Sequence, residues 1–267
     1  MKKTLCSAIA LCAVLVVPAS AQSFDAPVQA DVVQGWQLPN GQRVAALRLT
    51  LDPGWKTYWR APGDAGIPPR FDWSRARNIN DVRITWPQPQ VFHDGGMRSV
   101  GYKETLIIPL HIAPKRADKP VRLKMRMDLG ICSDVCAPFT LNFDATLDGT
   151  STKPVPVIAS ALASAPFSAQ EAGVRSATCR ITPLDDGLQI ETRINVPSAG
   201  GTEHTVIEAQ PGIWVSEPKT HREGKQLVAV AQMMHASGNA FSLDRSDVRI
   251  TILGSSHSVD IRGCSAG

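Results

Sequence analysis

Two long runs of alternating apolar and polar residues flank a pair of closely spaced cysteines, and they restrict the fold more than any other feature of the sequence. Apolar residues occupy every second position over residues 121–131 and again over 139–147, on either side of Cys132 and Cys136. A period of two is typical of β-strands that bury one face. The runs therefore predict an antiparallel hairpin with the cysteines at its tip.

A three-residue loop over residues 133–135 would set the register of this hairpin. Cys132 then lies opposite Cys136, with Cα atoms about 4.5 to 5.5 Å apart, which a disulfide accepts. Lys124 meets Asp144 as a cross-strand ion pair. Both cysteines share the parity of the charged residues, so we expect their sulfurs outside the core, within reach of a partner or a covering loop. The facing apolar pairs would be Leu129 with Phe139, Met127 with Leu141, and Met125 with Phe143.

The chain begins like an exported protein. Lys2 and Lys3 precede an apolar run and the small residues Ala19-Ser20-Ala21, which predicts a signal peptide over residues 1–21, cleaved after Ala21, and a periplasmic location. No later segment has the roughly 18 apolar residues of a membrane-spanning helix, so we expect no direct membrane insertion. The formal net charge is only +4, with no run of like charges, which disfavours nucleic acid as a partner.

Abundant turn residues and scarce helical periodicity favour β-sandwiches. Roughly 245 mature residues suit two domains. We predict a first sandwich over residues 22–150, a linker with a short helix over 151–173, and a second sandwich over 174–267. Strands are expected at 44–51, 82–86 and 105–113 in the first domain. Between them, residues 52–73 and 87–104 look like long irregular loops, where function tends to reside.

Cleavage would leave four cysteines, enough for two disulfides in an oxidising compartment. A bridge between Cys179 and Cys264 would close a long loop and contribute roughly 4 kcal/mol, so we interpret it as structural. A bridge between Cys132 and Cys136 encloses three residues and adds little stability, which favours a reversible redox role.

Alternatives remain open for this site. The Cys132–Cys136 pair can be a plain structural staple, or two ligands of a Cu(I) or Zn site completed by His93 or Met97. Two thiolates without a fixed third ligand are a weak metal signal, so we expect no metal and no cofactor. A docking module is a further alternative. Three aromatic residues can form a wall beside the cysteines or simply belong to the core: Trp55, Tyr58 and Trp59.

The order of several motifs resembles the N-terminal periplasmic domain of the DsbD family, and still more its ScsB-type relatives. These are "GWKTYW", "WPQPQVFHDGGMRSVGYKE", "TLIIPLHI" and a cysteine pair ending in "CAPF", within roughly residues 24–147. The resemblance implies an immunoglobulin-like sandwich that passes electrons from a membrane-embedded thiol donor to periplasmic thioredoxin-like proteins. The chain departs from the DsbD pattern in two ways. Three rather than five residues separate its cysteines, and it shows neither the transporter nor the thioredoxin-like domain. We therefore expect a freestanding relay module.

The resemblance also implies roles for individual residues. Cys132 and Cys136 would be the redox pair, and Cys136 would form the mixed disulfides. A cap loop that shields the thiols would correspond to "FHDGGM". A protonated His93 close to the pair would favour the thiolate, although an inert loop residue is the plainer interpretation. The cap residues nearest the thiols would be Phe92, His93, Asp94 and Met97.

Overall fold

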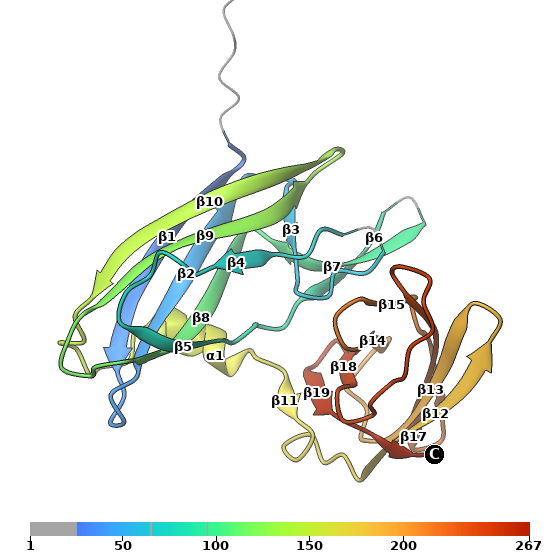
Figure 1. Cartoon of the computed structure of the whole chain (residues 1–267). Coiled ribbons are helices and arrows are strands. Elements are labelled where there is room, and N and C mark those ends of the chain that lie inside the picture. The colour runs from blue at the N-terminus through green and yellow to red at the C-terminus, as the bar shows by residue number, and fades with distance from the viewer. Residues whose placement is uncertain (1–25, 65, 95) are drawn as a thin grey trace, which may run out of the picture.

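The computed structural model describes residues 26–64, 66–94 and 96–267 of the chain. These residues form two β-sandwiches, each built from a four-stranded and a six-stranded sheet, and a short helix (Figure 1). The predicted all-β class with two sandwiches in tandem is therefore confirmed. The predicted signal peptide, with Cys6 and Cys12, lies outside the described residues.

The first sandwich carries the cysteine hairpin. Its four-stranded sheet has the order β1 (Val28–Gln37), β2 (Arg43–Leu51), β8 (Thr105–Pro114) and β5 (Ile79–Ile84). Its six-stranded sheet has the order β10 (Cys136–Leu147), β9 (Val121–Cys132), β3 (Lys56–Tyr58), β7 (Met97–Lys103) and β6 (Gln90–Asp94), and β4 (Arg70–Asp72) also pairs with β9.

The core of this sandwich follows from the alternation. Leu47 and Leu49 of β2 and Leu123 and Met127 of β9 are fully or almost fully buried between the two sheets. Because side chains alternate across a strand, the even-numbered residues of β9, which include Cys132, point to the outer face of the six-stranded sheet.

The predicted short helix is present as α1 (Pro156–Ala163), and proline at its start is compatible with the free N–H groups of a first turn. Ile158 and Ala161 of α1 are buried against the outer face of β2 and β8, where they meet Val44, Ala46 and Ile107. The helix explains why β2, unlike a strand with one wet face, is buried on both faces over most of its length.

The second sandwich contains the C-terminal strands. One sheet has the order β11 (Phe167–Ser168), β19 (Ser258–Arg262), β18 (Arg249–Leu253) and β14 (His204–Glu208). The other has the order β15 (Ile213–Val215), β17 (Gln226–His235), β13 (Gly187–Asn195), β12 (Ser176–Leu184) and β20 (Ser265–Ala266), and β16 (Lys219–Glu223) pairs with β17. The boundary residues between the domains stay a prediction.

The two segments expected to be irregular loops contain strands, so that expectation was wrong. Residues 52–73 hold β3 and β4, and residues 87–104 hold β6 and β7. Strands β3 and β4 have only three residues each, too few to show an alternation in the sequence. The β6–β7 hairpin pairs Asp94 with Met97 across two glycines, and Gly96 has a φ of 82°. Such a glycine pair is a hairpin signal in its own right.

The two sandwiches share a packed interface. Val206 of β14 and Leu253 of β18, both in the second sandwich, are buried in contact with the core of the first. Polar contacts surround this apolar contact; for example, the Gln88 side-chain amide donates to the Gly254 carbonyl oxygen at 3.2 Å. The interface therefore fixes loops of the first sandwich against strands of the second.

Candidate functional site

The β9–β10 hairpin brings the two cysteines together as predicted. Cys132 pairs with Cys136, their Cα atoms lie 4.1 Å apart, and their sulfurs form a disulfide. Lys124 does lie opposite Asp144, but Asp144 forms its ion pair with Arg122, at 2.5 Å, because the long guanidinium side chain reaches the diagonal position. The three apolar pairs occur in the predicted register: Leu129 with Phe139, Met127 with Leu141, and Met125 with Phe143.

The two cysteines differ in exposure. Cys136 is exposed, whereas Cys132 has no exposed surface. The predicted outward parity is correct, because Ile131 belongs to the core and Cys132 points the other way. Of the two neighbours expected for these sulfurs, a partner or a covering loop, Cys132 has the second kind, because side chains of this chain cover the outer face of the sheet at this point. The disulfide thus offers one sulfur to an incoming partner.

Tyr58 covers the buried sulfur. Its hydroxyl oxygen lies 2.9 Å from Cys132 Sγ and 3.3 Å from Cys136 Sγ, and its side chain is itself buried. Strand β3 places it there by pairing with β9, and the Thr57 hydroxyl donates to the Gly130 carbonyl oxygen at 2.9 Å. A hydroxyl at this distance can donate a hydrogen bond to a thiolate when the disulfide opens.

The other two aromatic residues of "GWKTYW" lie in the core. Trp59 has no exposed surface, and Trp55 packs against the core of the first sandwich. Of the two interpretations, core membership therefore applies to both tryptophans, while Tyr58 lies beside the cysteines. The sequence showed the cluster but not the direction in which each ring points.

A loop after β3 packs over Tyr58. A Cβ atom on Gly66 would lie 2.9 Å from Tyr58 Cδ1, and a Cβ atom on Gly130 would lie 2.8 Å from Ile67 Cβ. We call residues 60–64 and 66–68 the covering segment. Sequence reasoning missed its role, although glycine and proline in "APGDAGIPP" indicate a tight, non-strand path.

The predicted cap residues lie on the β6–β7 hairpin and do not all face the cysteines. The Phe92 ring lies 4.8 Å from Lys103 Nζ and 5.3 Å from Lys56 Nζ, and Lys56 is paired directly with Cys132. The His93 ring instead lies 5.5 Å from the ring of His204 in the second sandwich. Met97 is 59% exposed, and the backbone of Asp94 pairs with it. Shielding of the thiols by this hairpin stays a prediction.

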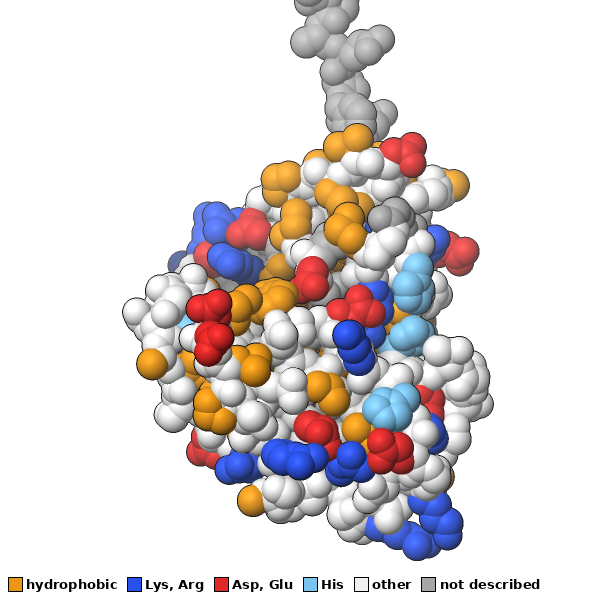
Figure 2. Space-filling view, turned by 90° about the vertical axis from the view of Figure 1, so that its right-hand side faces the viewer, with side chains coloured by type: hydrophobic (Ala, Val, Ile, Leu, Met, Phe, Trp, Pro, Cys, Tyr) orange, Lys and Arg blue, Asp and Glu red, His pale blue; other side chains and the backbone are white. Residues whose placement is uncertain are grey.

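Hydrophobic side chains gather on the upper part of the face in Figure 2, the side of the molecule toward which β6, β7 and the β9–β10 tip extend in Figure 1. Val135, next to Cys136 in the hairpin loop, is 70% exposed, and Ile67 of the covering segment is 39% exposed. Large exposed apolar side chains beside a reactive group are typical of a surface that contacts another protein.

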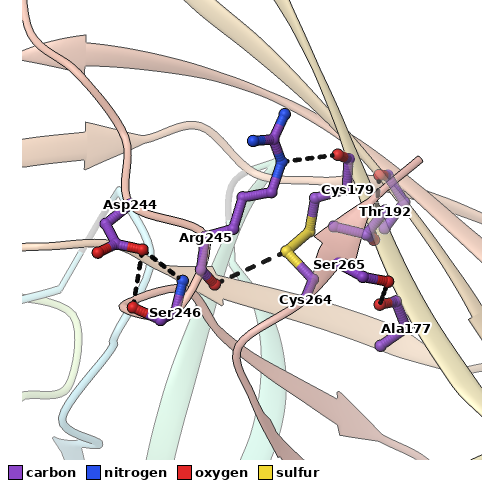
Figure 3. Close-up of a disulfide and its surroundings, with 9 residues drawn as sticks. Ala177, Cys179, Thr192, Asp244, Arg245, Ser246, Cys264 and Ser265 are labelled. Carbon is purple, nitrogen blue, oxygen red and sulfur yellow. Dashed lines mark hydrogen bonds between the residues drawn. A yellow bond between two sulfur atoms is a disulfide. The ribbon is translucent and has the colours of Figure 1, made fainter.

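The second disulfide joins Cys179 of β12 to Cys264, which precedes β20, over a sequence separation of 85 (Figure 3). Cys179 is fully buried in the core of the second sandwich. Arg245 contacts both half-cystines: its Nε donates to the Cys179 carbonyl oxygen at 3.2 Å, and its own carbonyl oxygen lies 3.9 Å from Cys264 Sγ. This burial is what a structural bridge requires, and its structural role stays a prediction.

Two further observations concern the part of the chain that the structure describes. No group of three or more His, Cys, Asp or Glu side chains there is arranged to hold a metal ion. No helix in this part is long and apolar enough to cross a membrane.

Fold and site together define a class of protein: a β-sandwich domain with a disulfide-forming cysteine pair at an exposed hairpin tip. Residues 23–147 match the family described as "Thiol:disulfide interchange protein DsbD, N-terminal". The N-terminal part of the chain therefore belongs to the DsbD N-terminal domain family, whose chemistry is thiol–disulfide interchange. The match ends at the last residue of β10, so it contains both cysteines of the hairpin.

The chain is also similar to the N-terminal periplasmic domain of ScsB from Proteus mirabilis, as seen in its crystal structure. The two share 19% sequence identity with a TM-score of 0.67, over 90% of this chain and 93% of that chain, so the shared fold extends over both sandwiches. Bovine butyrophilin aligns over 89% of this chain and 99% of its own, but its 8% identity and TM-score of 0.19 carry no weight for the fold. No curated protein matches the sequence.

Proposed function

We propose that this protein is a periplasmic electron relay that passes reducing equivalents from a membrane-embedded thiol donor to periplasmic thioredoxin-like proteins through Cys132 and Cys136. The observation that carries the proposal is the unequal exposure of the two cysteines, with Cys136 exposed and Cys132 buried beneath Tyr58. Membership of the DsbD N-terminal domain family supports the same chemistry. The similarity to a periplasmic domain supports the location.

Reduction of the protein would begin at the exposed sulfur. A donor thiolate attacks Cys136 Sγ, the Cys132–Cys136 bond breaks, and Cys132 leaves as a thiolate. A second donor thiolate then attacks the donor sulfur of the mixed disulfide and releases Cys136 as a thiolate. The donor ends as a disulfide, and the relay takes up two electrons and ends with both cysteines reduced.

Delivery would reverse this order. The Cys136 thiolate attacks a partner disulfide and forms a mixed disulfide, while one partner sulfur leaves as a thiolate and takes up a proton. The Cys132 thiolate then attacks Cys136 Sγ, which restores the intramolecular disulfide and frees the second partner thiolate. The opposed strand positions of the two cysteines allow this closure without rearrangement of the hairpin.

Two groups beside Cys132 are suited to stabilise its thiolate. The Tyr58 hydroxyl, 2.9 Å from Cys132 Sγ, can donate a hydrogen bond to the charged sulfur. The Lys56 side chain lies on the same outer face of the sheet as Cys132, because these residues are directly paired. A nearby cation and a hydrogen-bond donor both lower the pKa of a cysteine, which makes it a better leaving group.

The test is the reduction potential of the Cys132–Cys136 couple in the mature protein. The protein is equilibrated in defined dithiol buffers, alkylated, and analysed by peptide-resolved mass spectrometry so that Cys179 and Cys264 are scored separately. We expect a potential within the roughly −120 to −270 mV range of catalytic thioredoxin-type couples. A potential below about −300 mV would mark the bridge as a structural staple and overturn the relay.

A further inference from the structure

The covering segment is held by the second sandwich through specific side chains. The Arg60 guanidinium donates to both carboxylate oxygens of Glu208, with Nε–Oε1 at 3.1 Å and Nη2–Oε2 at 2.9 Å, and also to the Thr251 hydroxyl at 3.2 Å. Farther along the segment, Trp214 Nε1 donates to Asp64 Oδ1 at 3.0 Å. Both contacts join residues about 150 positions apart in the sequence.

Arg60 is placed for a positioning role. Its guanidinium stacks on the ring of Trp59, 3.8 Å from the centroid, and its side chain is only 13% exposed. Burial lowers the pKa of Arg60, and the Glu208 carboxylate opposes this effect. A guanidinium removed from water needs such a partner, so the bidentate Glu208 contact fixes the direction in which the chain leaves β3.

The other side of the segment contacts the redox site. Gly66 packs on the Tyr58 ring, and the Pro62 carbonyl oxygen accepts from the Val100 N–H of β7 at 2.9 Å. Tyr58 in turn reaches both sulfurs. A continuous series of contacts therefore runs from Glu208 through Arg60 and the covering segment to Tyr58 and Cys132.

We propose that the second sandwich positions Tyr58 over Cys132, with the Arg60–Glu208 ion pair as the positioning contact, and so sets the reduction equilibrium of the Cys132–Cys136 pair. The inference deepens the proposed function, and its biological meaning rests on that function. The reduction equilibrium of the Cys132–Cys136 pair can be measured whether or not the protein is a relay. It gives the second sandwich a role in the chemistry without placing any of its residues at the sulfurs. A Tyr58 hydroxyl held in place favours the dithiol form, because it stabilises the Cys132 thiolate.

The experiment is a double-mutant cycle on the full mature chain, with Glu208→Gln, Tyr58→Phe and both substitutions together. The readout is the equilibrium constant for reduction of the Cys132–Cys136 bridge in glutathione buffers. Tyr58→Phe should lower this constant about tenfold, as expected for loss of a hydrogen bond to a charged group. Glu208→Gln should lower it roughly three- to tenfold by the positioning argument, and should add nothing in the Tyr58→Phe background.

The matched control is Glu203→Gln. Glu203 makes a bidentate contact with Arg222 at 2.6 and 2.8 Å, but within the second sandwich. It should lower stability and leave the reduction equilibrium unchanged. Arg60→Lys, which keeps the charge and loses the bidentate geometry, should act like Glu208→Gln and serves if that variant does not fold.

Two results would overturn the positioning role: a wild-type equilibrium constant in Glu208→Gln or Arg60→Lys, or additive effects of Glu208→Gln and Tyr58→Phe. A wild-type reduction potential as low as that of a structural disulfide would overturn the relay proposal instead. In that case the coupling between Glu208 and Tyr58 would still be measurable, so failures of the two proposals are distinguishable.

Discussion

Gly130 lies against the ring of Tyr58, and a Cβ atom at position 130 would stand 3.0 Å from Tyr58 Cδ2. Gly130 shares the outer face of β9 with Cys132, two residues further along. Because glycine has no side chain, the ring can approach the strand closely and bring its hydroxyl to the sulfurs. The burial of Cys132 beneath Tyr58 therefore requires a residue without a side chain at position 130.

Gly130→Ala should therefore open the site. The added methyl group would also lie 2.8 Å from Ile67 Cβ, so Tyr58 or the covering segment must move. We expect a loss of about 1 to 3 kcal/mol in the free energy of unfolding, the usual cost of overpacking. We also expect faster alkylation of Cys132 in the reduced protein. Urea denaturation and time-resolved alkylation with peptide mass spectrometry measure the two effects.

Gly224→Ala is a control for this substitution, because a Cβ atom at Gly224 meets nothing within 4 Å. Alanine is strained at the φ of 59° found for Gly224, so this substitution also lowers the stability of the backbone. The strain lies in the β16–β17 turn of the second sandwich, away from the hairpin that carries the cysteines. It should leave Cys132 alkylation unchanged. Wild-type alkylation of Cys132 in Gly130→Ala would show that Tyr58 does not control access to this sulfur.

The two single cysteine variants should trap partners unequally. Cys132→Ser leaves the exposed Cys136 without its resolving thiol, so mixed disulfides should accumulate. Cys136→Ser leaves only the buried Cys132, and we expect at least about tenfold less adduct, because exchange needs an accessible sulfur. Non-reducing gels of the variants incubated with an oxidised thioredoxin-like protein give the yields. Equal yields would contradict the assignment of Cys136 as the attacking sulfur.

The hairpin register could be predicted because a slip by one residue would move every apolar side chain of both strands to the wet face. Cys132 therefore had one possible partner position in β10. Its burial could not be predicted, because Tyr58 is 74 residues away and reaches the sulfur only through the β3–β9 pairing. Strand β3 has three residues, too short to show a period.

The contact between the sandwiches was likewise hidden in the sequence. Arg60 and Glu208 are separated by 148 residues, and neither stands in a recognisable motif. A surface arginine and a buried interface arginine look alike until the chain is folded. Some strands of the second sandwich, by contrast, show alternation in the sequence: residues 226–233 contain most of β17 and residues 258–264 contain all of β19, whereas β15 and β20, with three and two residues, are too short to show it.

Replacement of both Cys179 and Cys264 by Ala should destabilise the protein without removing its redox pair. In the chain-entropy model, a bridge with a sequence separation of 85 contributes about 4 kcal/mol. We expect the urea midpoint of the second sandwich to fall accordingly. In the absence of urea, where that sandwich stays folded, the potential of Cys132–Cys136 should not change. A shift in that potential in a folded variant would indicate that the second disulfide takes part in exchange.

The contact between the β6–β7 hairpin and the second sandwich contains two histidines, His93 and His204, with ring centroids 5.5 Å apart. Burial lowers the pKa of His204, and the positive charge of Arg98 and the neighbouring His93 lower it further, while Glu217 opposes the shift. Burial also lowers the pKa of His111, with a smaller effect of Arg83. Both imidazoles are therefore harder to protonate in the folded protein than in the unfolded chain.

The free energy of unfolding should consequently fall as the pH is lowered from 7.5 to 5.5. In this window the unfolded chain, whose histidines have pKa values near 6.5, binds more protons than the folded protein. His204→Gln should reduce the pH dependence and leave the part due to His111. Urea midpoints at the two pH values measure the effect. Equal pH dependence in His204→Gln and the wild type would show that His204 does not contribute.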